Sequence, residues 1–282
     1  MVATLVRPGV GELQNRDELY REMILAPLRK CADYLPKMGG EGEVDLDGFT
    51  HIYGVDPLYH WMGFDSPLMF AAHKAAGGMT SIYRQLGIGC ERLFRRVLRD
   101  QFSLTEEQVT WSYEIISDGE PEDAGKSVKP RILSLDGRVN VDDVQDAAAA
   151  ARVRAWIDRQ REELDISAPL KGAVFEVRQG YKSADSKRQN ADLANAAQAL
   201  GHGYLPVLTI MSTQINHAVR ARYATGNWSV LMGTVSADDS LHSTFDFMHQ
   251  VVGYDLRAFF ERNTETLRAS MEDILSALLE AK

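Results

Sequence analysis

The stretch from Ala173 to Gln189, AVFEVRQGYKSADSKRQ, determines how the rest of the chain is interpreted. It begins as a β-strand, in which alternate side chains share one face. Ala173, Phe175 and Val177 then form an apolar face that can be buried. The other face carries the row Glu176, Arg178, Gly180 and Lys182. Ionised groups beside a core strand are costly unless they have partners or a function, so this row marks a candidate site.

The segments around this strand predict an α/β fold. Further strands are expected at 109–116, 131–135, 204–212 and 228–235. The run YLPVLTIMS (204–212) is nearly all apolar, as in a strand at the centre of a sheet. Ser183 or Asp185 is placed to cap a helix over 186–200. These elements predict a central mixed sheet flanked by helices.

The N-terminal part has the pattern of a helical region. A helix is expected over 16–35, with a kink at Pro27, and short helices over 56–78 that end at Gly77 and Gly78. The segment 81–101 has a single apolar side and predicts one further helix. We therefore expect an N-terminal helical region (1–79) and a core with C-terminal helices (80–282), forming one compact unit.

The composition is that of a globular protein. The chain has 282 residues, 45% hydrophobic and 25% charged, with a net charge of −9. This charge argues against a protein that coats nucleic acid, although local basic clusters can line a DNA-binding cleft. Those clusters are Arg84, Arg92, Arg95, Arg96 and Arg99; Arg178, Lys182, Lys187 and Arg188; and Arg220 with Arg222.

The location expected for this chain is the cytoplasm. Cys31 and Cys90 are far apart and have no metal-binding spacing, which is typical of reduced thiols. The first residues lack the apolar core of a signal peptide. No segment approaches the roughly 20 apolar residues that span a bilayer, so no membrane association is expected.

The charged row suits the hydrolysis of a phosphodiester. Two carboxylates can hold Mg²⁺, and a fixed cation can stabilise the charge of the transition state. Glu176 needs a second carboxylate: Asp136, in LSLDGRV, or Asp165, in ELDIS. The next helix places further polar side chains at a turn that favours anions, namely Lys187, Arg188, Gln189 and Asn190. The alternative is an exposed ladder of salt bridges without a function.

An acidic residue on one strand, then Glu-x-basic on the next, then a helix and a strand resembles the PD-(D/E)xK nuclease superfamily. The strings FEVRQGYKSADSKRQNAD, SIYRQLGIGCERLFRRVL and SLDGRV are similar to those of a group of type II restriction endonucleases. The resemblance implies a restriction-endonuclease-like core in which Asp136 and Glu176 bind Mg²⁺. It also implies sequence-specific cleavage of double-stranded DNA by a homodimer, since two-fold sites are cut by two-fold proteins.

The sequence departs from the family at the third position of the motif. The family has Lys two residues after the Glu, and this chain has Arg178. Arginine stays protonated and is a poor base for water. Lys182 can take the lysine role, with Arg178 as a phosphate contact. A repair or recombination nuclease with the same core, or a DNA-binding module with an inactive site, stay open as alternatives.

Two further groups of residues have a possible role. The segment STQINHAVRARY follows the central strand, where the ends of strands face ligands in sheets of this kind. Its side chains that suit base edges are Gln214, Asn216, Arg220 and Arg222. Glu91 is either an accessory carboxylate of the site or a surface residue paired with Arg95.

Overall fold

The computed structural model describes residues 10–38, 42–115, 131–180, 186–235 and 238–280. The chain divides into two compact units. Met1–Leu93 and Ala258–Lys282 form the first, called here the helical unit, and Phe94–Arg257 form the second, called the sheet unit. The sequence predicted a division after residue 79, but α4 continues across that position and the units divide after Leu93 and after Arg257. Most of the C-terminal helix belongs to the first unit.

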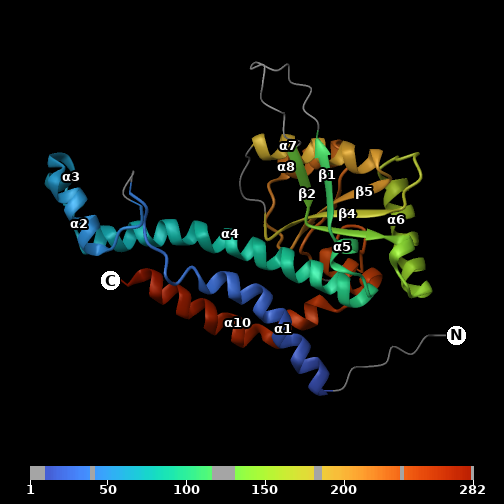
Figure 1. The fold of residues 1–282 in the computed structure, drawn as a ribbon, viewed down its shortest axis with the longest axis horizontal. Helices are drawn as coiled ribbons and strands as arrows, with labels where there is room; N and C mark the ends of the chain where they lie inside the picture. Colours follow the sequence, from blue (N-terminus) through green and yellow to red (C-terminus); the bar gives the residue numbers. More distant parts are fainter. Residues whose placement is uncertain (1–9, 39–41, 116–130, 181–185, 236–237, 281–282) are drawn as a thin grey trace, which may run out of the picture. The chain divides into compact units, whose positions relative to one another are not determined.

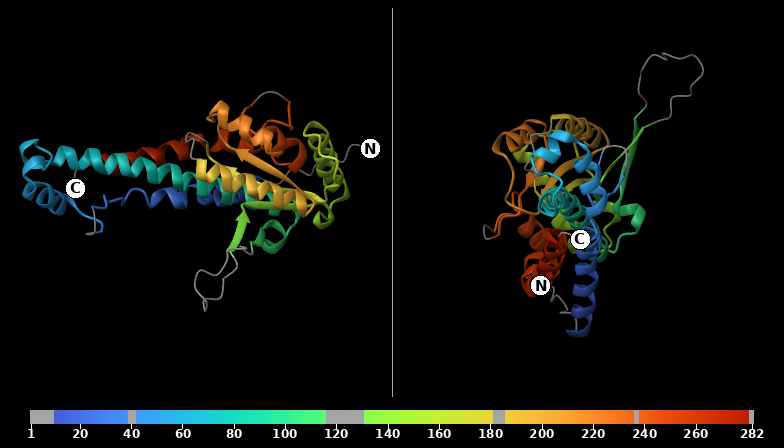
Figure 2. Two further views of the ribbon diagram at one scale, coloured as in Figure 1. Left: turned by 90° about the horizontal axis from the view of Figure 1, so that it is seen from above. Right: turned by 90° about the vertical axis from the view of Figure 1, so that its left-hand side faces the viewer.

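The helical unit is built from α-helices. They are α1 (Val10–Arg29), α2 (Leu46–Val55), α3 (Pro57–Trp61), α4 (Pro67–Phe102) as far as Leu93, and α10 (Leu256–Leu279) from Ala258. Figures 1 and 2 show α1, α10 and this part of α4 lying side by side. Their apolar faces form the core of the unit, where Tyr20 and Phe259 make an edge-on aromatic contact at 6.0 Å.

The helix α4 continues through Gly77 and Gly78, so the prediction that helices end there is wrong. The physical reason is close packing. A side chain at Gly77 would lie 2.1 Å from the hydroxyl of Tyr34, and one at Gly89 would lie 2.9 Å from the backbone of Ile24 on α1. These glycines let neighbouring segments approach the helix, and their cost in helix propensity of about 1 kcal/mol each is offset by that packing.

The sheet unit holds all the strands among the described residues. Its elements after α4 are α5 (Glu106–Val109), β1 (Trp111–Ile115), β2 (Arg131–Leu135), β3 (Gly137–Asn140), the 3₁₀ turn η1 (Val141–Asp143), α6 (Ala147–Glu163), β4 (Gly172–Arg178), α7 (Ser186–Gly201), β5 (Tyr204–Ile210), α8 (His217–Thr225), β6 (Ser229–Leu231), α9 (Thr244–Phe247) and the π-helical turn η2 (Met248–Val252). Each strand predicted from the sequence is present, and the last is shorter than expected.

The strands form a mixed four-stranded sheet and a small antiparallel sheet. The larger has the order β3-β4-β5-β6, with β3 antiparallel to β4 and the other pairs parallel. The smaller pairs β1 with β2. The crossover from β4 to β5 passes through α7, as expected for neighbouring parallel strands. The predicted α/β class with a mixed sheet is confirmed.

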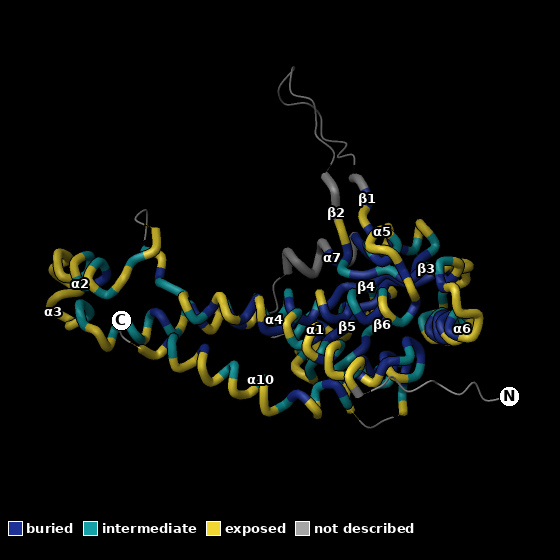
Figure 3. The backbone as a smooth tube through the Cα atoms, turned by 60° about the horizontal axis from the view of Figure 1, so that its bottom comes forward, coloured by how far each residue is buried: buried dark blue, intermediate teal, exposed yellow. Residues whose placement is uncertain are grey.

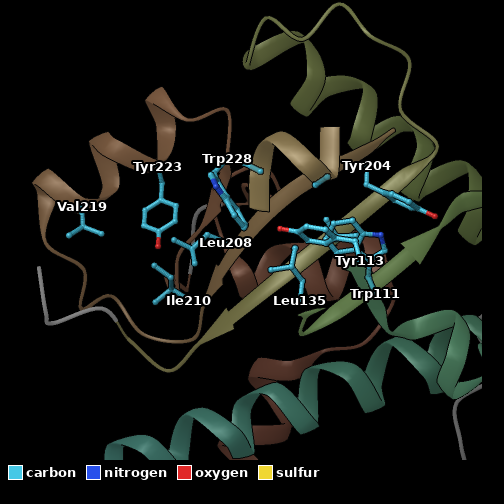
Figure 4. Close-up of a cluster of buried hydrophobic side chains, with 12 residues drawn as sticks. Trp111, Tyr113, Leu135, Tyr204, Leu208, Ile210, Val219, Tyr223 and Trp228 are labelled. Atoms are coloured by element: carbon cyan, nitrogen blue, oxygen red, sulfur yellow. The ribbon is translucent and has the colours of Figure 1, made fainter. Parts of the chain in front are cut away.

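Helices cover both faces of the larger sheet. On one face, side chains of α7 and α8 pack with those of β4 and β5, and Figure 4 shows Tyr223 and Trp228 beside Leu208 in this cluster. On the other face, Phe175 contacts Phe94 at 5.1 Å and Phe247 at 5.7 Å. Figure 3 accordingly shows β4 and β5 as buried. Charged residues on β4 therefore lie in a covered sheet, where they need partners.

Two further expectations concern membranes and thiols. Among the described residues, no helix combines the length and the apolar character needed to cross a bilayer. Cys31 and Cys90 are both free and buried. Burial raises the pKa of the Cys90 thiol to about 12, so this group is protonated and unreactive at neutral pH.

Candidate functional site

The candidate site lies at the carboxyl end of β4. Glu176 and Arg178 point to the face covered by α7 and α8, and their side chains are only 10% and 12% exposed. A guanidinium nitrogen of Arg178, Nη2, lies 2.6 Å from Oε1 of Glu176. The two residues are thus a buried ion pair and not an exposed ladder. A buried pair of this kind contributes little net stability, which favours a functional role.

The predicted row of four positions is shorter in the structure. The strand ends at Arg178, and Gly180 follows it in irregular backbone. A side chain at Gly180 would lie 2.8 Å from the hydroxyl of Ser212, so the segments that follow β4 and β5 meet here. The strand predicted from Gly172 through Arg178 is thus confirmed, and only Glu176 and Arg178 of the row lie on it. Lys182 lies outside the described residues.

Asp136 occupies the bend between β2 and β3 and contacts both neighbours of Glu176. Its backbone N–H donates to the carbonyl of Phe175 at 2.8 Å. Its Oδ2 accepts a hydrogen bond from the N–H of Val177 at 2.7 Å. These bonds fix the carboxylate of Asp136 beside the segment that carries Glu176. Of the two candidates for the second carboxylate, the structure brings this one to the site.

The rival carboxylate has a different environment. Asp165 is exposed and follows α6, with a backbone φ of 52°. Its N–H donates to the carbonyl of Glu162 at 3.3 Å. Asp165 therefore belongs to the end of a surface helix. It stands at the start of the connection to β4, whereas Glu176 lies near the strand's far end.

Sequence reasoning missed two residues of the site, Asp192 and Tyr223. Asp192, on α7, is 4% exposed, and its Oδ2 lies 3.4 Å from Nη2 of Arg178. The same oxygen accepts a hydrogen bond from the hydroxyl of Tyr223 on α8. A signal was present: Asp192, Asn195, Ala196 and Ala199 are buried at helical spacing, so a carboxylate stands at a core position of α7.

Arg95, named from the sequence as a member of a basic cluster, also contacts the site. It lies in the last part of α4, and its Nε donates to the backbone carbonyl of Asp136 at 2.8 Å. The contact fixes the bend that carries the carboxylate. Arg96 and Arg99 of the same predicted basic cluster form ion pairs with Asp100 and Glu106, which neutralises them locally.

Several carboxylates act on the guanidinium of Arg178. Burial acts to lower the pKa of the Arg178 guanidinium, but Glu176, Asp192, Asp136 and Tyr223 outweigh it and hold that pKa above its ordinary value. Three carboxylates thus act on one guanidinium. Arg178 is permanently protonated and cannot serve as a base. Carboxylates that lie close together in a covered site favour binding of a cation.

The carboxylates fit Mg²⁺ by their chemistry. Asp136 and Glu176 offer oxygen ligands, which Mg²⁺ prefers. Among the described residues, no three His, Cys, Asp or Glu side chains gather in a group that could hold a metal ion. The protein would therefore supply two carboxylates, with water and phosphate at the other positions, as is usual for Mg²⁺.

Arg178 also has a group suited to an anion. Its Nε is buried and has no hydrogen-bond partner among the described residues. A buried guanidinium N–H without an acceptor is costly, and a phosphate oxygen could satisfy it. One end of this side chain is thus fixed by Glu176, while Nε stays available.

The structure separates the predicted DNA-binding residues into two groups. Asn216 caps α8, accepting a hydrogen bond from the N–H of Ala218 at 2.8 Å, and Gln214 and Arg220 are exposed near it. Arg222, on the same helix, is partly buried. Side chains are not described for the second group, in the first turns of α7: Lys187, Arg188, Gln189 and Asn190.

Comparisons with known proteins do not assign this site. No protein-family model, no curated protein and no solved structure matches the chain. The chemistry of Asp136, Glu176, Arg178 and Asp192 is therefore the basis for a function.

Proposed function

We propose that this protein is a Mg²⁺-dependent endonuclease of the PD-(D/E)xK type that hydrolyses double-stranded DNA at specific sequences, as a homodimer in the manner of type II restriction enzymes. One observation carries the proposal. Asp136 is bonded to both neighbours of Glu176 from the adjoining strand, and Arg178 follows on the same face. Two carboxylates and a cation at the end of a covered strand suit phosphodiester hydrolysis.

Asp136 and Glu176 would hold the metal. When bound, Mg²⁺ polarises a phosphoryl oxygen and lowers the pKa of a bound water. The hydrogen bond from Val177 and the contact from Arg95 keep Asp136 in place without reorganisation. The pair of carboxylates thus forms a rigid anionic site for a hard cation.

Arg178 and Lys182 are given different roles. Arg178 is proposed to bind the phosphate through Nε and to stabilise the negative charge of the transition state. Its raised pKa excludes proton transfer from this group at neutral pH. Lys182 is proposed to accept a proton from the attacking water, the role that lysine takes in the family. DNA contacts are assigned to the first turns of α7 and to the segment from Gln214 to Arg222.

The first experiment is cleavage of plasmid DNA with and without Mg²⁺, with the ends mapped. Discrete fragments are expected from the wild type and none from Asp136→Ala or Glu176→Ala. Asp165→Ala is the matched control, since it removes a carboxylate from a surface helix end and should cut normally. Smeared or junction-specific cleavage would indicate a repair nuclease. Full activity of Glu176→Ala would disprove the proposal.

A second experiment separates the two basic residues. Lys182→Ala should lower the cleavage rate about 10²–10⁴-fold with little change in DNA affinity, as for the loss of a general base. Arg178→Lys retains the charge but loses the fork-shaped guanidinium, and should weaken both cleavage and binding. If Arg178→Lys instead cuts faster, the lysine role belongs to position 178.

One observation favours a second candidate, a DNA-binding module with an inactive nuclease site. Glu176 is engaged by Arg178 at 2.6 Å, which opposes metal binding through that oxygen. This candidate predicts sequence-specific DNA binding that is unchanged by Mg²⁺ and no cleavage by the wild type. A gel-shift titration alongside the plasmid assay distinguishes the two.

A further inference from the structure

An apolar stripe runs along the exposed side of α4 within the helical unit. Leu68 is 81% exposed, Met79 36% and Tyr83 38%, and Ala72 and Ala76 between them are also exposed. Their spacing of three or four residues places them on one face of the helix. The residues of α4 that are buried in the unit's own core follow a different i, i+4 row: Phe70, Lys74, Gly78 and Ile82.

The stripe continues into a second exposed apolar surface at the N-terminal end of α4. Here α2 and α3 form a tip that Figure 3 colours largely as exposed. Val55 is 67% exposed, Leu58 60%, Trp61 78% and Met62 62%. Exposed apolar surface of this extent, rather than single residues, marks an interaction site.

The charges along this part of the chain are segregated. From Met38 to His73 the sequence has six acidic residues and no Lys or Arg. From Lys74 to Leu93 it has Lys74, Arg84 and Arg92 against a single acidic residue, Glu91. Lys74 is buried and donates to carbonyls of α10, whereas Arg84 and Arg92 are exposed. The tip itself carries Asp47, Asp56 and Asp65, so acidic and basic side chains stand at opposite ends of the same stripe.

We propose that a second copy of this chain covers the stripe, with the two α4 helices antiparallel about a two-fold axis between Ala75 and Ala76. Under that symmetry Leu68 of one copy meets Tyr83 of the other, and Ala72 meets Met79. The large side chain of Leu68 thus packs against that of Tyr83, and the small side chain of Ala72 leaves room for that of Met79. Such a patch is self-complementary, as an isologous interface requires.

The same symmetry brings opposite charges together. Arg84 of one copy falls opposite Pro67 of the other, two residues from Asp65 and within one turn of it. Because the tip extends beyond Leu68, it lies along the partner's α4 beyond Tyr83, toward Arg92. A parallel arrangement would place tip against tip and repel. Charge thus selects the antiparallel pairing.

Oligomeric state is the first test, and it does not depend on whether the protein cuts DNA. Sedimentation equilibrium of the full chain should give twice the monomer mass of 31.5 kDa. Met79→Asp with Tyr83→Asp should halve that mass. Leu275→Asp, on α10, is the matched control, because Leu275 is 37% exposed and lies off the stripe. Thermal unfolding of each variant verifies that it is folded.

Cross-linking tests the orientation. Ala76→Cys places a thiol next to the two-fold axis, so mild oxidation should give a disulfide-linked dimer. Leu68→Cys is the control: the Leu68 residues of the two copies are separated by 15 helical positions, about 22 Å, and should not cross-link. The native thiols are buried.

Three outcomes would overturn the proposal. They are a monomer at every concentration, a dimer unaffected by the double Asp variant, and equal cross-linking at positions 68 and 76. The last would indicate a parallel pair. A charge test adds to these: Arg84→Glu should weaken the dimer, and Arg268→Glu, at an exposed position of α10, should leave its mass unchanged.

Discussion

Among the described residues, each unit has a cluster of charged side chains around a buried carboxylate, and the two clusters differ in their number of carboxylates. In the helical unit, Arg262 binds Asp17 through two hydrogen bonds of 3.0 and 3.1 Å, and Asn263 adds a third at 3.3 Å. Arg21 donates in turn to Asn263 at 2.7 Å. Asp17, the carboxylate of this cluster, is thus held by a guanidinium and an amide. In the sheet unit, Glu176, Asp192 and Asp136 all act on the guanidinium of Arg178.

The two clusters differ in the number of carboxylates around one guanidinium. The first cluster joins two helices, α1 and α10, through one carboxylate. The second gathers three carboxylates about Arg178 under a covered sheet, an arrangement that folding alone does not require and that agrees with the proposed metal site. The comparison yields predictions for both clusters.

The largest effect is expected from Arg178→Ala. It removes the guanidinium that contacts both Glu176 and Asp192, and breaking a buried ion pair in this way costs about 3–5 kcal/mol of the free energy of unfolding. Urea titration at neutral pH measures the loss. Wild-type stability in this variant would mean that the guanidinium does not hold the cluster together, and the comparison would fail.

Asp17→Asn should have a smaller effect, about 1–3 kcal/mol, as for a buried hydrogen-bonded group that loses its charge. Arg262 has a side chain that is 39% exposed and can turn to water. The variant should keep the cleavage rate and DNA affinity of the wild type. A loss of cleavage at unchanged stability would show that the cluster around Asp17 also serves function.

Mg²⁺ should stabilise the wild type by about 1.4 kcal/mol when its free concentration is ten times its Kd. The rise in Tm should disappear in Glu176→Gln, which removes a ligand charge, and persist in Asp17→Asn. Thermal unfolding in Mg²⁺ and in an equal ionic strength of Na⁺ measures this. An equal rise for all three proteins would mean that the ion binds elsewhere.

The smallest effect concerns His242, whose ring nitrogens lie 2.7 Å from Glu163 and 2.9 Å from Asp239. Burial lowers its pKa, but the hydrogen bonds to both carboxylates outweigh this and raise it above the ordinary 6.5. The ion pairs of protonated His242 therefore stabilise the folded protein fully at pH values below the ordinary pKa of 6.5. This stabilisation is lost as the pH rises through the higher pKa that His242 has in the folded protein. The exposed pairs are worth a few tenths of a kcal/mol.

The check is the difference in unfolding free energy between wild type and His242→Gln. It should be larger at about pH 6 than at about pH 9, the range in which imidazole loses its proton. Neither ionic cluster contains histidine, so Arg178→Ala and Asp17→Asn should retain the same pH difference. A constant offset between pH values would show that His242 is neutral in the fold.

Much of the fold followed from local patterns. The strands β1, β2, β4, β5 and β6 were predicted because β-branched, aromatic and apolar runs are local signals, whereas the short strand β3 was not. The continuity of α4 was not, because Gly77 and Gly78 resemble a helix end until Tyr34 and Leu278 are seen packed against them. A glycine that ends a helix and a glycine that allows close packing within a helix cannot be told apart from the local sequence.

The site was predicted in part. Asp136, Glu176 and Arg178 could be named from the sequence because Asp136 directly follows one strand and Glu176 and Arg178 lie at the end of another. Asp192 and Tyr223 were missed because their contacts with Arg178 arise only when α7 and α8 pack on the sheet. The role of Lys182, and those of the α7 side chains from Lys187 to Asn190, stay predictions.

The division into units has a consequence for synthesis on the ribosome. The sheet unit is continuous in sequence, whereas the helical unit needs residues from both Met1–Leu93 and Ala258–Lys282. The sheet unit can therefore fold as it emerges, while α1 and α4 wait for α10. At about 5–20 residues per second, nascent chains expose these unpaired helices for several seconds or longer. A chaperone that shields apolar helices should therefore engage the chain late in translation.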